Sequence, residues 1–323
     1  MRAVQIKEAG GPEALEIVEI ERPSPGDGEV LIEVAAAGVN FIDTYQRSGL
    51  YPMEFPFSPG LECAGTVAEL GDGVSTFAVG DRVAVAEGAG SYAEFRVASE
   101  SRCVQVPEGV SFDQAAASML QAMTAHYLAV DTYPLAPGDK CLIHAAAGGT
   151  GRLLVQLAKT AGAEVFATVG SAPKAELAAS AGADHVINYS EKDFADEIRS
   201  IAGVDRPLDV VYDGVGASVF DQSLGLLRPR GLMATFGNAS GPVDPVPPLA
   251  LMSGGSLFLT RPSLFDYVAT TEQLRTKAQA VFGSISSGEL EIRIDTVFDL
   301  EQAADSHRHL EARKSTGKLL IRP

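Results

Sequence analysis

Between residues 140 and 259 the sequence alternates short apolar segments with amphipathic ones, and this alternation restricts the possible folds most strongly. Several of the apolar segments are almost wholly aliphatic, which is typical of parallel strands that are covered on both faces. The predicted strands are Lys140–His144, Glu164–Val169, His185–Asn188, Leu208–Asp213, Gly231–Phe236 and Ser256–Leu259. The predicted helices between them are Gly149–Ala161, Pro173–Ala181, Asp193–Ala202 and Ser218–Leu227. The pattern predicts an α/β domain with a doubly wound parallel sheet.

Residues 3 to 97 follow a different pattern, in which short β segments are separated by turn signals such as Ser24–Gly28 and Gly71–Gly73. The expected strands are Ala3–Ile6, Leu15–Ile20, Val30–Ala36, Thr66–Leu70, Arg82–Ala86 and Tyr92–Val97. These segments predict a β-rich, barrel-like lobe.

The boundary between the two patterns lies in a helical stretch. Ser111 and Gln114 have the spacing of a capping box ahead of an alanine-rich helix, and a helix is expected to continue over Leu120–Val130. The tail returns to a mixed pattern, with expected elements at Thr271–Ser287 (helix), Glu291–Phe298 (strand), Asp299 with Gln302 (helix start) and Lys318–Ile321 (strand). We expect the tail to rejoin the first lobe, so that residues 1–122 and 265–323 form one discontinuous domain and residues 123–264 the other.

Charge and cysteine content restrict the partners and the compartment. With 42 acidic and 25 basic side chains the formal net charge is −17, and a field of this sign repels phosphate backbones and anionic lipid headgroups. We therefore expect neither a nucleic-acid partner nor a membrane. The three cysteines are widely spaced, and the amino-terminal residues hold no apolar signal segment. These features predict a protein of the reducing cytoplasm.

A glycine-rich turn stands between the first parallel strand and the helix that follows it. Compared with the dinucleotide pattern Gly-x-Gly-x-x-Gly, the three positions are Ala146, Gly148 and Gly151, so alanine replaces the first glycine. Small residues there let the backbone approach a pyrophosphate, whose charge is stabilised by the helix N-terminus. A tight strand–helix turn without a ligand is the alternative. The position of the turn at the first of six alternating strands favours the dinucleotide site.

The second strand indicates which dinucleotide is bound. An NAD site usually presents a carboxylate to the ribose hydroxyl, but this strand runs into Gly170, Ser171 and, after two more residues, Lys174. A hydroxyl and an ammonium group suit a 2′-phosphate. Lys174 could instead be a solvated surface lysine. Together with the missing acid, the pattern predicts NADPH as the cofactor.

Other catalytic signatures are missing from the sequence. Two-lobed hydride-transfer enzymes often use zinc, but Asn40 and Leu61 stand where thiolate and imidazole ligands would be needed, and Glu62 with Cys63 does not complete a tetrahedral site. We therefore expect no metal. The signatures of acyl transfer and of phosphoryl transfer do not occur either. His144, at the end of the first parallel strand, is expected to be a packed core residue.

Several segments together carry a family resemblance: Asn40–Tyr51, His144–Gly151, Val211–Gly216, Phe236–Gly241 and Thr260–Ser263. In order and spacing they resemble the zinc-independent quinone oxidoreductases of the medium-chain dehydrogenase/reductase superfamily, the zeta-crystallin-like group. The similarity covers essentially the whole chain. It implies a GroES-like catalytic domain, a Rossmann domain, NADPH between them, and a homodimer joined through the Rossmann domains.

The resemblance also implies roles for individual residues. The residues matched to acceptor positioning and oxygen stabilisation are Asn40, Tyr45, Tyr51 and Asn238. The residues matched to cofactor binding are Asp43, Thr44, Gly148, Gly149, Thr150, Gly170, Ser171, Lys174, Tyr189, Phe236, Gly237, Arg261, Pro262, Ser263 and Arg313. Asp43 is expected to be a positioning acceptor rather than a base. Phe236 is expected to pack rather than to stack on the cofactor.

Some of these residues have structural alternatives, and two positions depart from the family. Tyr45 and Tyr51 could be half-buried lobe residues, Asn238 a loop-capping amide and Arg313 a surface ion-pair former. Thr150 stands where the family usually has valine, a change that a turn tolerates. Lys318 stands where the family commonly has a small polar residue, which predicts an extra charge at the pocket rim.

The predicted activity is hydride transfer from NADPH to a quinone. A reductase of α,β-unsaturated aldehydes or ketones is the closest alternative, because it needs the same hydride donor and a similar oxygen-stabilising pocket. A non-catalytic crystallin-like or RNA-binding protein is a third possibility, which the net charge of −17 disfavours.

Overall fold

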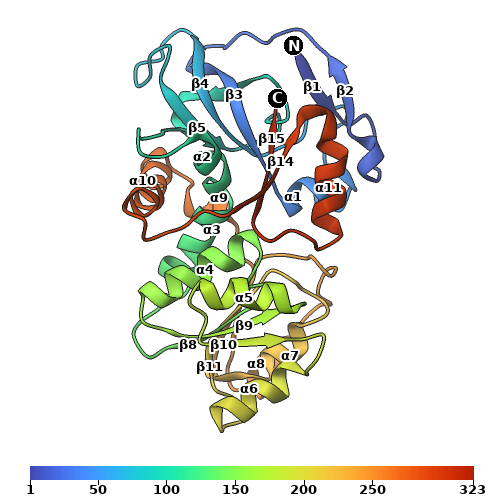
Figure 1. The fold of residues 1–323 in the computed structure, drawn as a ribbon, viewed down its shortest axis with the longest axis vertical. Coiled ribbons are helices and arrows are strands. Elements are labelled where there is room, and N and C mark those ends of the chain that lie inside the picture. Colours follow the sequence, from blue (N-terminus) through green and yellow to red (C-terminus); the bar gives the residue numbers. More distant parts are fainter. The chain divides into compact units, whose positions relative to one another are not determined.

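The computed structural model describes residues 1–323, which divide into two units. Unit 1 consists of Met1–Met123 and Val268–Pro323, and unit 2 consists of Thr124–Tyr267. Both chain ends therefore lie in unit 1, where Figure 1 marks them. The boundaries predicted at residues 122 and 264 precede these by one and three residues.

Unit 2 is built on a six-stranded sheet in the order β10-β9-β8-β11-β12-β13, and every strand pair is parallel. Its strands are β8 (Lys140–Ile143), β9 (Glu164–Val169), β10 (His185–Asn188), β11 (Leu208–Asp213), β12 (Leu227–Thr235) and β13 (Phe258–Thr260). From β8 the chain winds outward to β9 and β10 and then returns to β11. This reversal between β8 and β11 is the switch point at which doubly wound sheets bind ligands. The predicted fold class is confirmed.

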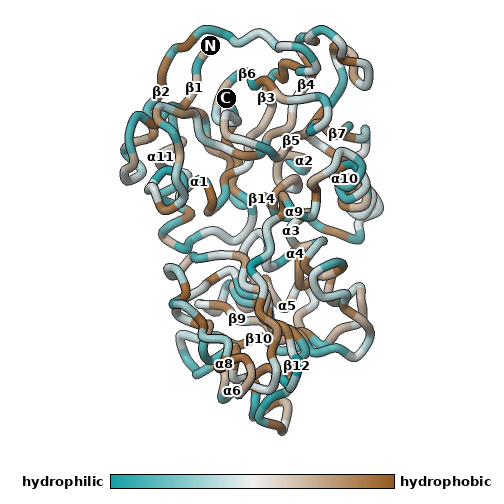
Figure 2. Tube along the Cα trace, turned by 180° about the vertical axis from the view of Figure 1, so that it is seen from behind, coloured by the Kyte–Doolittle hydropathy of each residue, from teal (hydrophilic) through white to brown (hydrophobic).

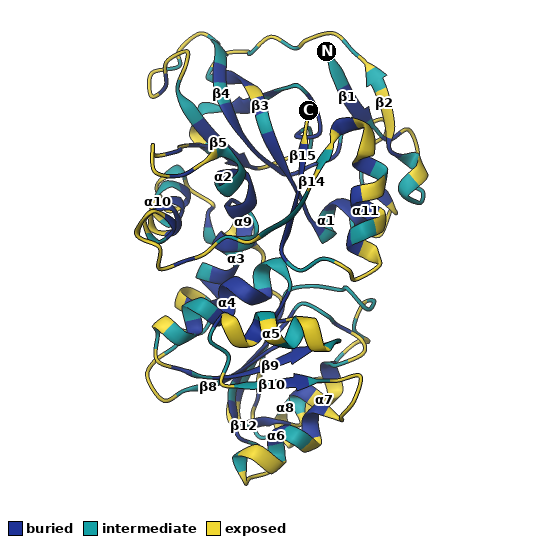
Figure 3. Ribbon diagram, viewed as in Figure 1, coloured by how far each residue is buried: buried dark blue, intermediate teal, exposed yellow.

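Helices cover both faces of this sheet, as Figure 1 shows. The helices of unit 2 are α4 (Gly149–Thr160), α5 (Ala172–Ser180), α6 (Phe194–Ala202), α7 (Phe220–Leu224), α8 (Pro248–Ser253) and α9 (Leu264–Tyr267). α4 and α5 lie on one face, and α6 to α8 lie on the other. Phe166, Ile198 and Met233 belong to the core between the sheet and the second group. Figure 2 shows hydrophobic residues along β9 and β10, and Figure 3 shows buried strands beside an exposed α5.

Unit 1 contains a seven-stranded sheet in the order β14-β15-β3-β4-β5-β7, with β6 also paired to β3, and a two-stranded β1-β2 pair. The strands are β1 (Arg2–Gln5), β2 (Glu16–Glu19), β3 (Glu29–Val39), β4 (Glu62–Leu70), β5 (Arg82–Ala86), β6 (Phe95–Ser99), β7 (Cys103–Gln105), β14 (Ile294–Asp299) and β15 (Lys318–Arg322). β15 comes from the tail and pairs with β3 from the first lobe. The tail therefore rejoins the first lobe, as the sequence predicts.

The helices of unit 1 are α1 (Phe41–Arg47), α2 (Phe112–Ser118), α10 (Thr271–Ser287) and α11 (Ala303–Glu311), and α3 (Gln121–Tyr127) crosses the unit boundary. The predicted capping box opens α2, because the Gln114 N–H donates to Ser111 Oγ at 3.1 Å and the Ser111 N–H donates to Gln114 Oε1 at 3.0 Å. The continuous helix expected over Leu120–Val130 is instead α3 followed by a π-helical turn, Leu128–Thr132.

Among the α-helices and strands, four short ones were not predicted from the pattern: α1, α8, α9 and β7. Each spans three to seven residues, which is too short for a periodic signal. The strand expected at Tyr92–Val97 begins only at Phe95. Tyr92 lies in a turn, where its N–H donates to the Pro59 carbonyl at 3.0 Å. Ala93 makes only an isolated antiparallel bridge with Ala3, so this segment is joined to β1 without forming a continuous strand.

No helix of either unit is both long enough and apolar enough to cross a bilayer.

Candidate functional site

In unit 1, α1 begins at the end of β3 and carries or adjoins five of the predicted site residues, Asn40, Asp43, Thr44, Tyr45 and Tyr51. Asn40 is its N-cap residue, and its N–H donates to Asp43 Oδ2 at 2.8 Å. Asp43 stands at the third helical position, where a carboxylate stabilises the helix start. Asp43 thus accepts a bond that fixes the start of α1, and its role toward the cofactor stays a prediction. Both residues are buried.

The side chain of Asn40 belongs to a buried polar network. Its Oδ1 accepts from Lys318 Nζ at 2.7 Å and from Gln121 Nε2 at 3.1 Å. Its Nδ2 donates to Glu62 Oε1 at 2.7 Å and to the Gly38 carbonyl at 3.3 Å. Lys318 Nζ also donates to Glu62 Oε1, which makes an ion pair with side chains 2% and 0% exposed. All the hydrogen-bonding capacity of the Asn40 amide is used inside unit 1, so its role toward an acceptor stays a prediction.

A second buried chain of hydrogen bonds ends on Asp43. Arg47 can only donate, so its contact of 3.0 Å makes His307 Nδ1 an acceptor. His307 Nε2 therefore carries the proton and donates to the Tyr92 oxygen at 3.3 Å. Tyr92 in turn donates to Asp43 Oδ2 at 3.0 Å. Arg47 is itself paired with Glu311 at 2.5 Å.

Burial shifts the pKa of two groups in this chain. Desolvation raises the pKa of Asp43 to about 7, against the bonds from Asn40 and Tyr92, which favour the charged form. Oδ2 of Asp43 accepts both of these bonds, whereas Oδ1 is buried and has no hydrogen-bond partner. Desolvation and the nearby charge of Arg47 lower the pKa of His307 to about 3. The imidazole is therefore neutral at neutral pH.

The two predicted tyrosines lie side by side. The rings of Tyr45 and Tyr51 meet edge to face with centroids 5.3 Å apart, and the Tyr51 N–H donates to the Tyr45 carbonyl at 3.0 Å. Both side chains are half-buried. Thr44 is buried, and its hydroxyl donates to the Phe41 carbonyl at 2.7 Å. The structure thus brings Thr44 and both tyrosines together with Asn40 and Asp43 on or beside α1.

Of the two tail residues named from the sequence, Lys318 is buried and Arg313 is exposed. The extra rim charge expected from Lys318 is a wrong prediction, because the side chain is buried and paired with Glu62. The reason is that Lys318 opens β15, whose pairing with β14 and β3 draws it into the unit. Arg313 lies outside the strand in an exposed turn and has a positive φ of 55°.

In unit 2, the glycine-rich turn follows β8 and opens α4. The N-cap residue is Gly148, which has no side chain to cap the helix, and Gly149 and Thr150 form the first turn. A Cβ at Gly151 would lie 2.4 Å from the Ala145 carbonyl oxygen, so only glycine allows this close approach of helix and turn. An uncapped helix start of this kind suits a phosphate group. The residues present therefore fit the pyrophosphate of a dinucleotide.

His144 immediately precedes this turn and is a structural residue. Ser223 Oγ donates to the Val219 carbonyl at 2.6 Å, so it accepts from His144 Nε2 at 2.8 Å. His144 Nδ1 then accepts from Thr168 Oγ1 at 2.8 Å. Burial lowers the pKa of His144 to about 3. The expected core role is what the contacts show.

The end of β9 holds the residues predicted for the adenosine phosphate. Ser171 is the N-cap of α5, yet its hydroxyl makes no capping bond, and Lys174 lies in the first turn of that helix. A Cβ at Gly170 would lie 2.5 Å from the Tyr189 hydroxyl oxygen, so the tyrosine packs directly over the glycine. No carboxylate follows the strand. The structure brings Gly170, Ser171, Lys174 and Tyr189 together.

The loops after β11, β12 and β13 form a third group. Asp213 is buried and accepts from the N–H groups of Val215 at 2.7 Å and Gly216 at 2.9 Å, which shapes the turn after β11. Burial raises the pKa of Asp213, although those bonds favour its charged form. The ring of Phe236 packs on Gly214, where a Cβ would lie 3.1 Å from it.

Arg261 ties the second and third of these loops together. It donates to the Gly237 carbonyl at 3.0 Å. With its amide oriented to satisfy both neighbours, Asn238 donates to that carbonyl at 3.0 Å and accepts from Arg261 at 3.2 Å. Pro262 and Ser263 follow β13 in the same loop, and Ser263 is exposed. The loop-capping contacts of Asn238 leave its acceptor-side role as a prediction.

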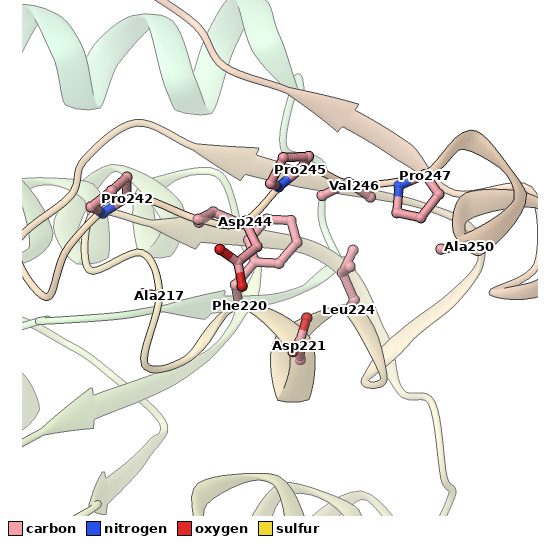
Figure 4. Close-up of a pocket in the computed structure, with 11 residues that line it drawn as sticks. Ala217, Phe220, Asp221, Leu224, Pro242, Asp244, Pro245, Val246, Pro247 and Ala250 are labelled. Carbon is pink, nitrogen blue, oxygen red and sulfur yellow. The ribbon is translucent and has the colours of Figure 1, made fainter.

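Unit 2 also has a surface pocket that is lined by other residues than the predicted site residues. Figure 4 shows it between α7 and the proline-rich segment that precedes α8. Its lining includes Phe220, Leu224 and Val246 with two acidic side chains, Asp221 and Asp244. None of the predicted site residues lines it, and its carboxylates disfavour an anionic cofactor.

Sequence reasoning assigned no network role to six residues: Arg47, Glu62, Tyr92, Gln121, His307 and Lys318. A charged residue in an apolar segment is the signal that could have found some of them. Lys318 precedes Leu-Leu-Ile in its strand, and Glu62 opens another strand. Buried charges of this kind are found almost only when they are paired.

Two family models match the chain. Residues 26–108 match the alcohol dehydrogenase GroES-like domain, and residues 149–286 match the zinc-binding dehydrogenase domain. The residues present do not fit the zinc that the second description implies. Asn40 supplies an amide, Leu61 supplies no ligand, and the carboxylate of Glu62 is held by the Lys318 ammonium.

Full-length relatives give a more specific match. The quinone oxidoreductase of Pseudomonas aeruginosa is 43% identical to this chain. The match covers 100% of this chain and 99% of that protein. A 2-haloacrylate reductase of a Burkholderia species is 39% identical, with 99% of this chain and 98% of that one covered. The structure of Escherichia coli quinone oxidoreductase complexed with NADPH matches with a TM-score of 0.97 and 40% identity over 100% of both chains. The chain therefore belongs to the quinone oxidoreductase family of the medium-chain dehydrogenase/reductase superfamily.

Proposed function

We propose that this protein is an NADPH-dependent quinone oxidoreductase that works without zinc. The observation that carries the proposal is that the two helices following β8 and β9 begin without a side-chain cap, at Gly148 and Ser171, in a chain that matches an NADPH complex over its full length. The first suits a pyrophosphate and the second suits a 2′-phosphate. NADPH, when bound, supplies the hydride, and the reduction of a quinone to a hydroquinone takes up one proton as well.

The chain's own residues bind and orient the two reactants in this proposal. Gly148, Gly149 and Thr150 hold the pyrophosphate. Ser171 and Lys174 hold the 2′-phosphate, and Tyr189 lies beside them at the same site. The loop residues Phe236, Gly237, Arg261 and Ser263, together with Asp43, Thr44 and Arg313, complete cofactor binding. Tyr45, Tyr51 and Asn238 position the acceptor and stabilise the charge that develops on its oxygen, while Asn40, whose amide bonds are all made inside unit 1, positions the start of α1.

A second acceptor class has an observation of its own. The 2-haloacrylate reductase relative is 39% identical over nearly its full length, compared with 41% for quinone oxidoreductase 1 of Escherichia coli. An activated carbon–carbon double bond conjugated to a carbonyl needs the same hydride donor and the same stabilisation of a developing oxygen charge. Reduction of enals and enones is therefore the alternative function.

Initial rates with purified, chelator-treated protein test these proposals. NADPH and NADH oxidation is followed with para- and ortho-quinones and, in parallel, with 2-alkenals and enones. We expect quinone turnover with NADPH at a rate that chelation does not change. Turnover of only enals or enones would support the alternative, and loss of activity on chelation would contradict the zinc-free site.

The proposal includes a homodimer formed through unit 2. β13 is the outermost strand of the sheet, and its Phe258 is 57% exposed. Leu249 and Met252 of α8 are 70% and 63% exposed. An unpaired strand edge beside exposed apolar side chains is typical of a surface that pairs with a second copy.

Light scattering during size-exclusion chromatography tests the dimer. We expect a dimer for the wild type and a monomer for Phe258→Lys, because a charge on a strand edge opposes pairing. A monomeric wild type, or a dimer that survives the lysine, would contradict this interface.

A cytoplasmic location is also part of the proposal. All three cysteines are buried free thiols, which suits a reducing compartment. Cell fractionation with marker enzymes is the test, and recovery of the protein outside the cytoplasmic fraction would contradict it.

A further inference from the structure

The buried ammonium of Lys318 lies between two oxygen atoms of unit 1. It donates to Asn40 Oδ1 at 2.7 Å and to Glu62 Oε1. The second carboxylate oxygen of Glu62 accepts from the Leu120 N–H at 2.6 Å. An ammonium group that has left water is stable only when its protons are bound by such acceptors.

These contacts decide the orientation of the Asn40 amide. Lys318 Nζ and Gln121 Nε2 can only donate, so the atom that faces them must be the amide oxygen. The carboxylate of Glu62 can only accept, so the atom that faces it must be the amide nitrogen. A flipped amide would place donor against donor and acceptor against acceptor.

Two glycines, Gly38 in β3 and Gly317 just before β15, make room for the ion pair. A Cβ at Gly38 would lie 2.4 Å from Glu62 Oε1 and 2.6 Å from the Ala116 carbonyl oxygen. A Cβ at Gly317 would lie 2.5 Å from the Arg293 carbonyl oxygen, which accepts from the Lys318 N–H at 2.8 Å. The backbone is therefore shaped so that the lysine can enter beside Asn40.

We propose that Lys318 is a positioning residue for the reaction, a built-in cation that holds the Asn40 amide, and with it the start of α1, in one arrangement. Asn40 is the N-cap of α1 and also bonds to Asp43, so a displacement of Asn40 is transmitted to the helix that carries Thr44 and Tyr45. The cation stands beside residues at positions where zinc enzymes of similar plan have ligands. The effect of Lys318 on turnover rests on the proposed function, whereas its effect on the orientation of the Asn40 amide does not.

Stability alone does not account for this arrangement. Replacing a buried ion pair by apolar side chains of similar volume is often neutral or stabilising, whereas removing one partner leaves an uncompensated buried charge. The variant Lys318→Met leaves Glu62 unpaired. The double variant Lys318→Met with Glu62→Leu removes both charges and keeps the volume, so it tests positioning even if the single variant does not fold.

Amide exchange tests the proposal independently of any enzyme activity. The sequence contains three asparagines, Asn40, Asn188 and Asn238, so selective ¹⁵N-asparagine labelling yields three pairs of side-chain NH₂ signals. We expect the Asn40 signal to be the most protected from solvent exchange, and its protection to fall at least about tenfold in either Lys318 variant. Unchanged protection in a folded variant would overturn the proposal.

Turnover supplies the second readout. With wild-type quinone reduction established, we expect either Lys318 variant to lose about tenfold or more in kcat/KM for the quinone while the Kd for NADPH changes less than twofold. Methylammonium should restore part of the activity of Lys318→Ala in a saturable way. Lys7→Met, which breaks the exposed Lys7–Glu16 ion pair, is the matched control and should behave as wild type. Full activity in the folded double variant would overturn the proposal, whereas an inactive wild type would contradict only the proposed function.

Discussion

The hydroxyl of Tyr51 can be removed without disturbing the ring contact that holds it. Its ring packs edge to face on Tyr45, and its backbone is fixed by a bond to the Tyr45 carbonyl. If the hydroxyl stabilises charge on the acceptor oxygen, Tyr51→Phe should lower kcat by about 10- to 100-fold and leave the NADPH Kd nearly unchanged. Steady-state kinetics and fluorescence titration give both numbers. Equal turnover in the two proteins would remove Tyr51 from the site.

The ammonium of Lys174 distinguishes the two nicotinamide cofactors. A charged bond to a 2′-phosphate contributes about 1.5–3 kcal/mol, so Lys174→Ala should weaken NADPH binding about 10- to 100-fold. NADH lacks that phosphate and should be nearly unaffected. The ratio of the two Kd values is the measurement, and equal losses would show that Lys174 does not bind the 2′-phosphate.

The carboxyl of Asp43 makes folding depend on pH. Its pKa is about 7 in the folded protein against an ordinary value of 3.8, so between these values the folded state holds a proton that the unfolded state has released. Stability from this group is complete below about pH 4 and is lost as the pH rises through 7, by about 1.4 kcal/mol per pH unit. Asp43→Asn keeps an acceptor for Asn40 and Tyr92 and should remove this dependence.

Urea unfolding at several pH values measures that difference. Asp81→Asn is the control, because Asp81 also accepts a backbone N–H but does so in an exposed turn. A stability difference between wild type and Asp43→Asn that stays constant from pH 4 to pH 7 would contradict the assignment.

At the scale of elements, the start of α4 depends on the absence of one side chain. A Cβ at Gly151 would lie 2.4 Å from a carbonyl oxygen, so Gly151→Ala must shift the turn and should cost about 1–3 kcal/mol. The same shift should weaken NADPH binding. Thermal unfolding and fluorescence titration are the measurements.

A glycine in another helix provides the matched control. Gly283 lies in α10, where a Cβ would meet no atom within 4 Å. Gly283→Ala should therefore stabilise the protein by about 0.5–1 kcal/mol, since glycine is unfavourable inside a helix. If both alanines had the same effect, close packing at Gly151 would not be the cause.

Predictability also differed between elements. The strands and helices of unit 2 have periodic patterns, and their predicted bounds mostly lie within a few residues of the observed ones. Helix α1, which carries much of the acceptor side, has only seven residues and was missed. Its start is stabilised by the bond between Asn40 and Asp43, and its position depends on contacts with distant segments.

At the scale of the whole molecule, acid stability should be limited by one neutral histidine in each unit. His144 and His307 have a pKa of about 3 in the folded protein, whereas an unfolded histidine takes up a proton near pH 6.5. Stability from these groups is complete above pH 6.5 and is lost as the pH falls toward 3, by about 1.4 kcal/mol per pH unit for each histidine. The Asp43 carboxyl has the opposite effect, because it stabilises the folded state as the pH falls, but it is one group against two histidines.

Replacement of either histidine by an uncharged amide should reduce the loss of folding stability that occurs as the pH falls below about 6.5. His144→Gln can still accept from Thr168 and donate to Ser223, and His307→Gln offers the same pair of functions to its neighbours. Unfolding midpoints from pH 4 to pH 7 are the measurement. If the pH dependence of the unfolding midpoint is unchanged in both variants, other groups cause the loss of stability in acid.

The sequence by itself determined the α/β class, the discontinuous arrangement of the two units and the glycine-rich turn after the first parallel strand. These features are written in local patterns, because strand and helix periodicity and turn chemistry depend on residues that are close together in the chain. The tertiary structure alone decided the buried polar networks. Lys318 and Asn40 are 278 residues apart, and Arg47 and His307 are 260 apart. Such charges are stable only where the complete fold removes water and brings a partner at the same time, and no local pattern encodes that coincidence.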